Sequence, residues 1–233
     1  SYQEFLLFHE LEDNDDALSK YINYGGLPGL KQVGLDDEEF VWDYIRAVFH
    51  TVMLKDIVER NNIRNVSFLN TLLRYFADTI GKLSSLNNIS KFMKSQGLDV
   101  SVKSIAAYLN YFRDAYLLLT VNRFDIHGKK LLESNEKIYF GDVGLRNLIA
   151  GGERQGDIEK ILENIVYQQL VRMGYAVSVG QLRAGEVDFV CTKSNERLYV
   201  QVAYLIASEE TEEREFGSLD NIKDNYPKYV ISM

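Results

Sequence analysis

Apolar residues recur at spacings of three and four along the first quarter of the chain, a pattern that predicts helices. A short helix is expected over residues 18–24, before the Gly- and Pro-rich turn at residues 25–29. A longer helix should begin at Asp36 or Asp37 and run to about Arg60. Its apolar face would hold Phe40, Val41, Tyr44, Ile45, Val48, Phe49, Val52 and Met53. We therefore predict a helical linker or lid segment over residues 1–60.

Residues 61–152 are expected to hold three helices and then two strands. The first helix would begin at Asn65 or Ser67 and end by Gly81, the second would span residues 88–95, and Ser101 would cap the third. Apolar and β-branched runs at residues 116–124 and 137–140 predict two strands, separated by a polar stretch at 127–136. Helices followed by a β hairpin are the order of a winged helix-turn-helix, so we predict a winged-helix domain with a β wing.

Residues 153–233 change to the order αβββαβ. A helix opened by Asp157 is expected over 158–173, followed by strands at 175–179, 186–192 and 197–203. A charged, helix-prone stretch at 209–224 then leads to a strand at 227–232, and an end on that strand suggests a domain truncated at its C-terminus. The predicted fold class is thus mixed α+β: an N-terminal helical segment, a winged helix-turn-helix and an αβββαβ domain.

Composition narrows the class of protein. With 233 residues, 46% of them hydrophobic, the chain can bury a large core, which excludes disorder of the whole chain. It has no apolar stretch near the roughly 20 residues that cross a bilayer, and its first residues lack the positive start of a secretory signal. We expect a soluble, cytoplasmic protein without a membrane partner. The single cysteine, Cys191, excludes an internal disulfide, and its apolar strand predicts a buried, inert thiol.

The distribution of charge points to a basic middle segment. The net charge is −8, but residues 61–130 hold 10 basic and 4 acidic side chains, a balance of +6. Phosphate groups of a nucleic acid would find a favourable field only there. A solvated basic face, or one that pairs with the acidic flanks, explains the same count, so both interpretations stay open.

In a winged helix the last helix of the three enters the major groove, and its exposed side chains contact phosphates and bases. Lys103 and Arg113 are the basic candidates on that helix, with Ser104 and Asn110 beside them. Further candidates for DNA contact are Lys91 and Lys94 on the preceding helix and Arg123, Lys129 and Lys130 in the wing. Three small helices and a hairpin also serve as a protein-docking module, which is the alternative.

Three residues of the last segment suggest a nuclease. Glu163 lies on the expected helix, Asp188 in the strand EVDFV and Gln201 in the strand YVQVAY. Nucleases of the restriction-endonuclease-like class place a helix Glu, a strand Asp and a Glu-x-Lys on the next strand around Mg²⁺, because oxygen ligands suit this hard cation. The order and spacing resemble that class, so residues 153–233 are predicted to form a restriction-endonuclease-like domain.

The chemistry of this site departs from the class. Gln201-Val202-Ala203 stands where Glu-x-Lys is required, so one anionic ligand becomes neutral and the lysine is absent. Lys160, one turn from Glu163, is the candidate for a relocated lysine. Three interpretations remain: a degenerate, inactive nuclease fold, a working nuclease with Mg²⁺ at Asp188 and Glu163, or a surface Glu and an ordinary strand Asp.

Other chemistries lack their motifs. The three histidines show no HExxH spacing, and neither a GxSxG elbow nor the GxxxxGK[ST] phosphate loop occurs. We therefore expect no cofactor in this chain, apart from Mg²⁺ if it is a nuclease, and no ATP hydrolysis by the chain alone.

Seven short motifs together resemble one family, the domain of unknown function 4143. They are YGGLPGL at 24–30, LKDIVERNNI at 54–63, YFGDVGLRN at 139–147, ENIVYQQL at 163–170, GEVDFV at 185–190, YVQVAY at 199–204 and YPKYVIS at 226–232. The resemblance covers nearly the whole chain. That family is the C-terminal region of prokaryotic AAA-type ATPases, with a winged-helix unit before a restriction-endonuclease-like part.

What the resemblance implies is an ATPase that binds ATP in an N-terminal domain absent from this chain. We expect the present chain to be its non-catalytic, DNA- or partner-binding region with a degenerate nuclease-like domain. The alternatives are a Mg²⁺-dependent nuclease with a relocated lysine, and a region for protein interaction or self-association.

Overall fold

The computed structural model describes residues 1–152, 155–183, 185–206 and 208–233, and its fold is mixed α/β with a mixed sheet, as the predicted class requires. The chain divides into two compact units: unit 1 is Ser1–Thr120 with Ile138–Arg154, and unit 2 is Val121–Lys137 with Gln155–Met233. The predicted boundaries near residues 60 and 152 stay predictions, and residues 153–154 lie outside the described residues. Within the described ranges, every helix is too short or too polar to cross a membrane.

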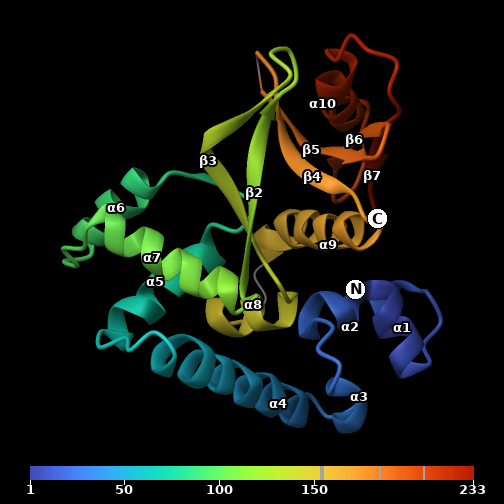
Figure 1. Cartoon of the computed structure of the whole chain (residues 1–233). Helices are drawn as coiled ribbons and strands as arrows, with labels where there is room; N and C mark the ends of the chain where they lie inside the picture. The colour runs from blue at the N-terminus through green and yellow to red at the C-terminus, as the bar shows by residue number, and fades with distance from the viewer. Residues whose placement is uncertain (153–154, 184, 207) are drawn as a thin grey trace. The chain divides into compact units, whose positions relative to one another are not determined.

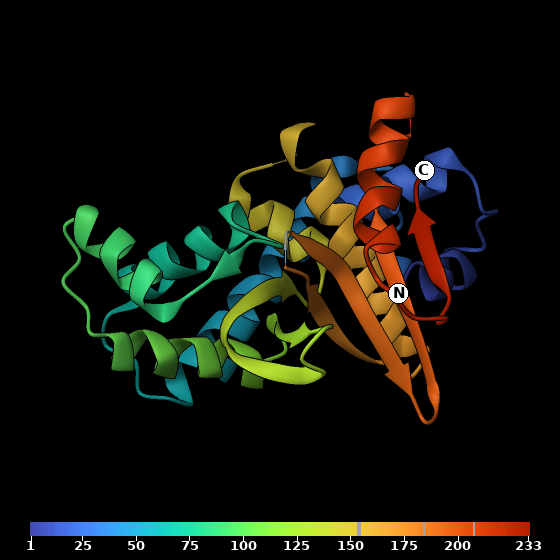
Figure 2. The same cartoon turned by 90° about the horizontal axis from the view of Figure 1, so that it is seen from above.

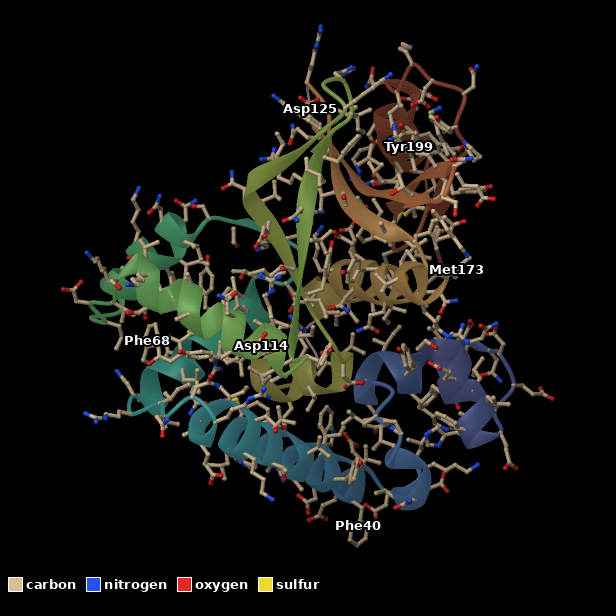
Figure 3. The ribbon with its side chains drawn as sticks, in the orientation of Figure 1. Phe40, Phe68, Asp114, Asp125, Met173 and Tyr199 are labelled. Atoms are coloured by element: carbon tan, nitrogen blue, oxygen red, sulfur yellow. The ribbon has the colours of Figure 1, made fainter. Side chains whose placement is uncertain are left out.

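Unit 1 begins with helices, and the predicted long second helix is present. The elements are α1 (Tyr2–His9), α2 (Asp15–Tyr24), α3 (Leu30–Val33), α4 (Glu38–Thr51) and the π-helix η1 (Val52–Glu59). Asp37 caps α4 by accepting hydrogen bonds from the backbone N–H groups of Glu39 and Phe40. Val41 and Ile45 are buried as expected, but Phe40 is 65% exposed and points away from the helices in Figure 3. Its place on the apolar face was wrong, since Val41, the next residue in the same turn, is the one that is buried.

Three helices follow in the predicted order, with a short strand that the pattern did not reveal. The helices are α5 (Val66–Asp78), α6 (Leu86–Ser95) and α7 (Val102–Asp114), and the strand is β1 (Leu83–Ser84). Figure 1 shows the three helices grouped. Asn65, Ser85 and Ser101 cap them through their side-chain oxygens. The rings of Phe76 and Phe112, 6.3 Å apart and both buried, join α5 to α7.

The hairpin is longer than predicted. Strands β2 (Leu118–Asp125) and β3 (Lys130–Phe140) leave only residues 126–129 as the connection, so the expected polar loop at 127–136 is wrong. Asp125 closes the turn by accepting from the backbone N–H groups of His127 and Gly128. Polar side chains fit in the first part of β3 because positions there, such as Lys130 and Asn135, are exposed. The polar sequence of this segment therefore suggested a loop, although the segment is a strand. The tip of the hairpin, residues 121–137, belongs to unit 2.

The motifs YGGLPGL and GDVGLRN contact each other in unit 1. Asp142, the cap of α8 (Val143–Ala150), accepts hydrogen bonds from Leu145 N at 3.1 Å and from Gly26 N at 2.8 Å. Asn147 Nδ2 donates to the carbonyl oxygens of Ile22 and Asn23 at 2.9 and 3.0 Å. A side chain at Gly25 would collide with the Asp142 carboxylate, so the glycine allows the close approach. These motifs therefore serve the core of unit 1.

Unit 2 is built on the sheet. Its further elements are η2 (Gln155–Asp157), α9 (Ile158–Arg172), β4 (Ala176–Gln181), β5 (Glu186–Lys193), β6 (Glu196–Val202), α10 (Glu209–Asp220) and β7 (Lys228–Ile231). The strand order is β3-β2-β4-β5-β6-β7. Strands β4, β5 and β6 are antiparallel, while β2–β4 and β6–β7 pair in parallel. The predicted αβββαβ order of elements is thus present.

Helices α9 and α10 cover opposite faces of this sheet. Phe189 of β5 contacts Tyr167 of α9, with the ring centroids 6.0 Å apart. Gln201 of β6 instead bonds to Glu215 of α10, and Phe189 pairs with Val200, the residue before Gln201. Because successive side chains of a strand point to opposite faces, the two helices lie on different sides, as Figure 2 shows. The central strand β5 is consequently buried along most of its length.

Candidate functional site

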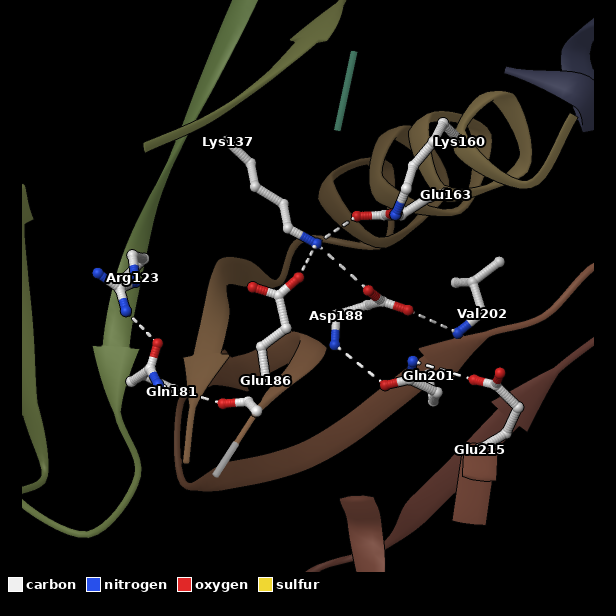
Figure 4. Close-up of polar contacts among 11 residues, drawn as sticks. Arg123, Lys137, Lys160, Glu163, Gln181, Glu186, Asp188, Gln201, Val202 and Glu215 are labelled. Atoms are coloured by element: carbon white, nitrogen blue, oxygen red, sulfur yellow. Dashed lines mark hydrogen bonds and ion pairs between the residues drawn. The ribbon is translucent and has the colours of Figure 1, made fainter. Parts of the chain in front are cut away.

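Lys137 of β3 lies at the centre of three carboxylates in unit 2 (Figure 4). Its Nζ atom is 2.7 Å from Glu163 Oε1, 2.8 Å from Glu186 Oε1 and 3.3 Å from Asp188 Oδ1. The Lys137 side chain is 1% exposed, and Glu163 and Asp188 are buried beside it. A buried charge requires a partner, so these contacts form one charge-paired cluster, which we call the Lys137 cluster.

The members of the cluster come from three elements of the unit, β3, α9 and β5. Glu163 lies near the start of α9, where Lys160, one turn earlier, donates to Glu163 Oε2 at 2.6 Å. Glu186 and Asp188 are two residues apart on β5, a spacing that puts both side chains on one face of a strand. Lys160 therefore does point toward Glu163, as the relocated-lysine hypothesis required, but Lys137 is the lysine that Asp188 contacts.

Asp188 and Gln201 bridge a fork between β5 and β6. Regular pairing of these strands reaches Phe189 and Val200, one residue short of Asp188 and Gln201. Beyond it, Asp188 Oδ2 accepts from Val202 N at 3.0 Å, and Gln201 Oε1 accepts from Asp188 N at 3.2 Å. Side chains thus replace the ladder hydrogen bonds at the point where the strands separate.

Gln201 needs its amide at this place. Its Nε2 donates to Glu215 Oε2 at 3.1 Å, while its Oε1 accepts from the Asp188 backbone. An ionised glutamate can only accept hydrogen bonds, so it could not donate to the buried Glu215 carboxylate. The neutral residue is therefore matched to its neighbours in α10.

The charges of the cluster set the pKa values of its members. Burial lowers the pKa of the Lys137 ammonium, but the carboxylates of Glu163, Asp188 and Glu186 outweigh burial and raise this pKa above its ordinary value. Burial likewise raises the pKa of Glu163, yet Lys137 and Lys160 together hold it below its ordinary range. Lys137 and Glu163 are accordingly both charged at neutral pH.

The pKa of Asp188 shifts the other way, because burial outweighs its ion pair with Lys137. Burial, together with the neighbouring Glu163 carboxylate, raises the pKa of Asp188 to about 6. Lys137 lowers this pKa, but at 3.3 Å it does not offset the two opposing effects. Asp188 thus titrates closer to neutrality than an ordinary aspartate does.

The donor atoms as arranged do not fit a magnesium ion. Lys137 Nζ lies within 3.3 Å of one oxygen from each of Glu163, Glu186 and Asp188, between the atoms that would bind a cation. Across the described part of the chain, no three His, Cys, Asp or Glu side chains are grouped so as to hold a metal ion. The buried Ala203 offers neither charge nor donor. An ammonium thus fills the space between the oxygens that a bound cation would need.

Six of the seven basic residues predicted to contact DNA are exposed, four in unit 1 and two in unit 2. Lys91, Lys94, Lys103 and Arg113 are exposed in unit 1, and Lys94 is 3.3 Å from Asp99. Lys129 and Lys130 are exposed at the hairpin tip in unit 2. Arg123 is instead half-buried and donates to the side chain of Gln181. It is therefore engaged within the sheet, and we do not count it among the exposed basic residues.

Cys191 is fully buried in β5, and burial raises the pKa of its thiol to about 12, so it is an inert thiol as predicted.

Sequence reasoning missed two members of the cluster, Lys137 and Glu186. Glu186 could have been found, because it precedes Asp188 by two residues in the strand EVDFV. Lys137 opens the apolar run KIYF, and a lysine at the start of a strand carries no signal of burial. Its partners are 26 and 51 residues away, so only the folded sheet brings them together.

Comparison with known proteins places residues 15–156 in the family described as Domain of unknown function (DUF8612). An "Uncharacterized protein" of Haemophilus influenzae is 35% identical over the whole chain, which covers 57% of that relative. The "Uncharacterized protein MJ1544" of Methanocaldococcus jannaschii is 30% identical over 89% of the present chain, and the match covers 46% of that relative. The chain thus spans about half the length of these curated relatives, and no solved structure matches it.

These matches correct the family suggested by the motifs. The domain of unknown function 4143 is not the family that matches, and the relatives carry no description as ATPase C-terminal regions. Several motifs behind that suggestion, such as YGGLPGL and GDVGLRN, contact each other in the core of unit 1. The matched residues, 15–156, are well over half of the chain, and the chain belongs to the DUF8612 family.

Proposed function

We propose that this chain binds DNA without cleaving it. The observation that carries the proposal is the Lys137 cluster. A helix Glu, a strand Asp and a fork between two strands are the frame that restriction-endonuclease-like enzymes use on DNA, and here an ammonium fills the place of the cation. The frame favours a nucleic-acid partner, while Lys137 argues against catalysis.

The burial of the cluster also argues against cleavage. Lys137 and Glu163 are 1% exposed, and Asp188 is 5% exposed. A phosphodiester must come within about 3 Å of the groups that act on it, which these side chains do not allow without an opening of unit 2. The domain is on this view a retired nuclease-like fold.

Contact with DNA is assigned to unit 1. The order α5-β1-α6-α7, followed by the base of a hairpin whose strand β3 lies beside β1, supports a winged helix-turn-helix. On α7, Lys103, Asn110 and Arg113 are exposed, with the small residues Ala106 and Ala107 between them. Small residues between donors let a helix approach a groove closely, so α7 suits the major groove.

A binding assay with charge variants tests this assignment. The chain would be titrated with labelled duplex, single-stranded and branched DNA at 50 and 200 mM salt (about a fourfold range). We expect affinity to fall steeply with salt, because each neutralised phosphate contributes about 0.9 to the slope of log K against log salt. The double variant Lys103→Gln/Arg113→Gln should weaken binding about tenfold or more, whereas Lys55→Gln, exposed on η1, should leave it unchanged. Equal binding by the two variants would contradict the role of α7.

One observation favours a second function, a metal-dependent nuclease. The nuclease pattern requires a lysine at the position of Ala203, and Lys137 of β3 places one next to Asp188 instead. The carboxylates of Glu163 and Asp188 are thus accompanied by a lysine from another strand. Cleavage of DNA that disappears in Asp188→Ala would support this function.

Absence of DNA binding at low salt would instead favour the third alternative, a region for protein interaction or self-association.

A further inference from the structure

Unit 1 contains a cavity of about 380 Å³ that neither the DNA-binding face nor the Lys137 cluster uses. Its walls come from the end of α4, from η1, from α5 and from α8. Most of the lining is apolar, with Phe49, Met53, Leu73 and Ile149 on different sides. A volume of this size lies within the range of roughly 300–1,000 Å³ that small-molecule sites occupy.

The π-helix η1 shapes one wall. The backbone N–H of Arg60 donates to Lys55 O, five residues back, at 3.3 Å. This wider turn brings residues four and five positions apart to one face, so Met53, Leu54 and Val58 all line the cavity. Leu54 is 53% exposed, although it is a large apolar side chain. Helices of this type are rare and often lie at functional sites, which makes the wall a second, independent sign of a binding site.

Among the described lining residues of the cavity, Arg74 is the one that carries a permanent charge. Arg74, His50 and Asn70 are the polar lining residues among those that the structure describes, and none of the described lining residues is acidic. Arg74 is exposed and, among the residues that the structure describes, makes no hydrogen bond or ion pair. In a chain of net charge −8, an apolar cavity whose described lining carries a guanidinium and no carboxylate is complementary to an anion.

We propose that this cavity binds a small amphipathic anion, an apolar body carrying one carboxylate, with the carboxylate at Arg74 and the apolar body against Met53 and Leu73. The guanidinium donates two parallel hydrogen bonds to a carboxylate, and burial of the ligand's apolar body between α5 and η1 supplies the rest of the affinity. The site is independent of DNA binding, because its residues are not those of the exposed face of α7.

Octanoate and its neutral analogue octanol test the site in the whole chain. Binding would be measured by displacement of anilinonaphthalene sulfonate, a fluorescent probe with an apolar body and one anionic group. We expect octanoate to bind about tenfold more tightly than octanol, because only octanoate forms the charge-assisted hydrogen bonds. In Arg74→Gln the two affinities should become equal, whereas Arg64→Gln, exposed outside the cavity, should keep the tenfold difference.

A second variant tests the apolar part. Val66 lines the cavity and is 38% exposed, so Val66→Trp should fill the space without disturbing the core. We expect this variant to lose binding of both octanoate and octanol while its circular dichroism and melting temperature stay those of the wild type. Equal affinities of the two ligands for the wild type, or unchanged binding by Val66→Trp, would overturn the proposal. Octanoate binding that Arg74→Gln does not alter would overturn the role of the guanidinium.

Discussion

Nζ of Lys137 and Oε1 of Glu163 are 2.7 Å apart and both side chains are buried, although 26 residues separate them along the chain. The lysine comes from a hairpin strand and the glutamate from a helix, so the pair ties β3 to α9 inside unit 2. Glu186 and Asp188 complete the contacts of the ammonium. Because these charges are buried together, removing the ammonium would leave carboxylates inside the unit without their cation.

Replacing Lys137 by methionine should therefore destabilise the chain strongly. The substitution keeps most of the side-chain volume but leaves buried carboxylates without their cation, which typically costs about 3–5 kcal/mol. Lys130→Met, at an exposed position of the same strand, should change the free energy of unfolding by less than about 0.5 kcal/mol. Urea unfolding of both variants gives the comparison. A Lys137→Met variant as stable as Lys130→Met would show that the cluster contributes nothing.

Asp188 should make stability depend on pH. Its pKa is about 6 in the folded chain and 3.8 ordinarily, so the folded state binds more protons between these values. Stability from this group is therefore fully present below about pH 4 and is lost as the pH rises through 6, by on the order of 3 kcal/mol. In Asp188→Asn, which mimics the neutral acid, that loss should disappear. Unfolding free energies of both proteins at pH 4 to 7 measure the difference, and parallel profiles would refute the raised pKa.

Glu163 contributes with the opposite sign. Lys137 and Lys160 hold its pKa below the ordinary value, so its stabilisation is present above its ordinary pKa of 4.5 and is lost only as the pH falls through the depressed value. The comparison above stays near or above pH 4 for this reason. The loss of stability between pH 4 and 6 can then be attributed to Asp188.

Local signals predicted much of the fold, because they depend on neighbours in the sequence. Ser101 caps α7, and Asp37 caps α4, as side-chain oxygens next to apolar periodicity indicate. Features that depend on distant partners were not predictable. The π-helix η1 differs from an α-helix only in which carbonyl each N–H reaches, and β3 continues through polar residues because β2 pairs with it.

The candidate site shows the same division. Glu163, Asp188 and Gln201 were found from their spacing, and Asp188 and Gln201 do bond to each other. Lys137 could not be found, because its burial depends on which strands pair in the sheet. No local sequence pattern indicates that pairing. The family resemblance failed for a related reason. It relied on glycine motifs that meet in the core of unit 1, where close packing by itself requires glycine.

Gly144 should be essential for that packing. A side chain there would meet the carbonyl oxygen of Tyr24 well inside contact distance, and this oxygen is backbone that cannot move away easily. Gly144→Ala is expected to cost more than about 2 kcal/mol of stability. Gly217→Ala is the matched control, since nothing lies near that position in α10, and it should be neutral or stabilising by up to about 1 kcal/mol. Thermal melts that rank the two variants equally would contradict this account.

Gln201→Glu restores the acidic residue of the nuclease pattern, and we predict that it harms the protein. The new carboxylate would face Glu215 and lose the hydrogen bond that Nε2 donates now, at a cost of about 1–3 kcal/mol. Gln32→Glu, at an exposed position, should cost less than about 0.5 kcal/mol. Chemical denaturation compares them. A Gln201→Glu variant that gains stability would mean that the amide is not matched to Glu215.

Binding and cleavage read from the same samples test the central claim most directly. The chain, with Asp188→Ala as the reference, would be incubated with labelled duplex and branched DNA at low salt in the presence of Mg²⁺ or Mn²⁺. We predict salt-sensitive binding with the DNA intact in every sample, because the Lys137 ammonium lies between the carboxylates that would have to bind the metal ion. Metal-dependent cleavage by the wild type that Asp188→Ala abolishes would contradict this account and establish a nuclease.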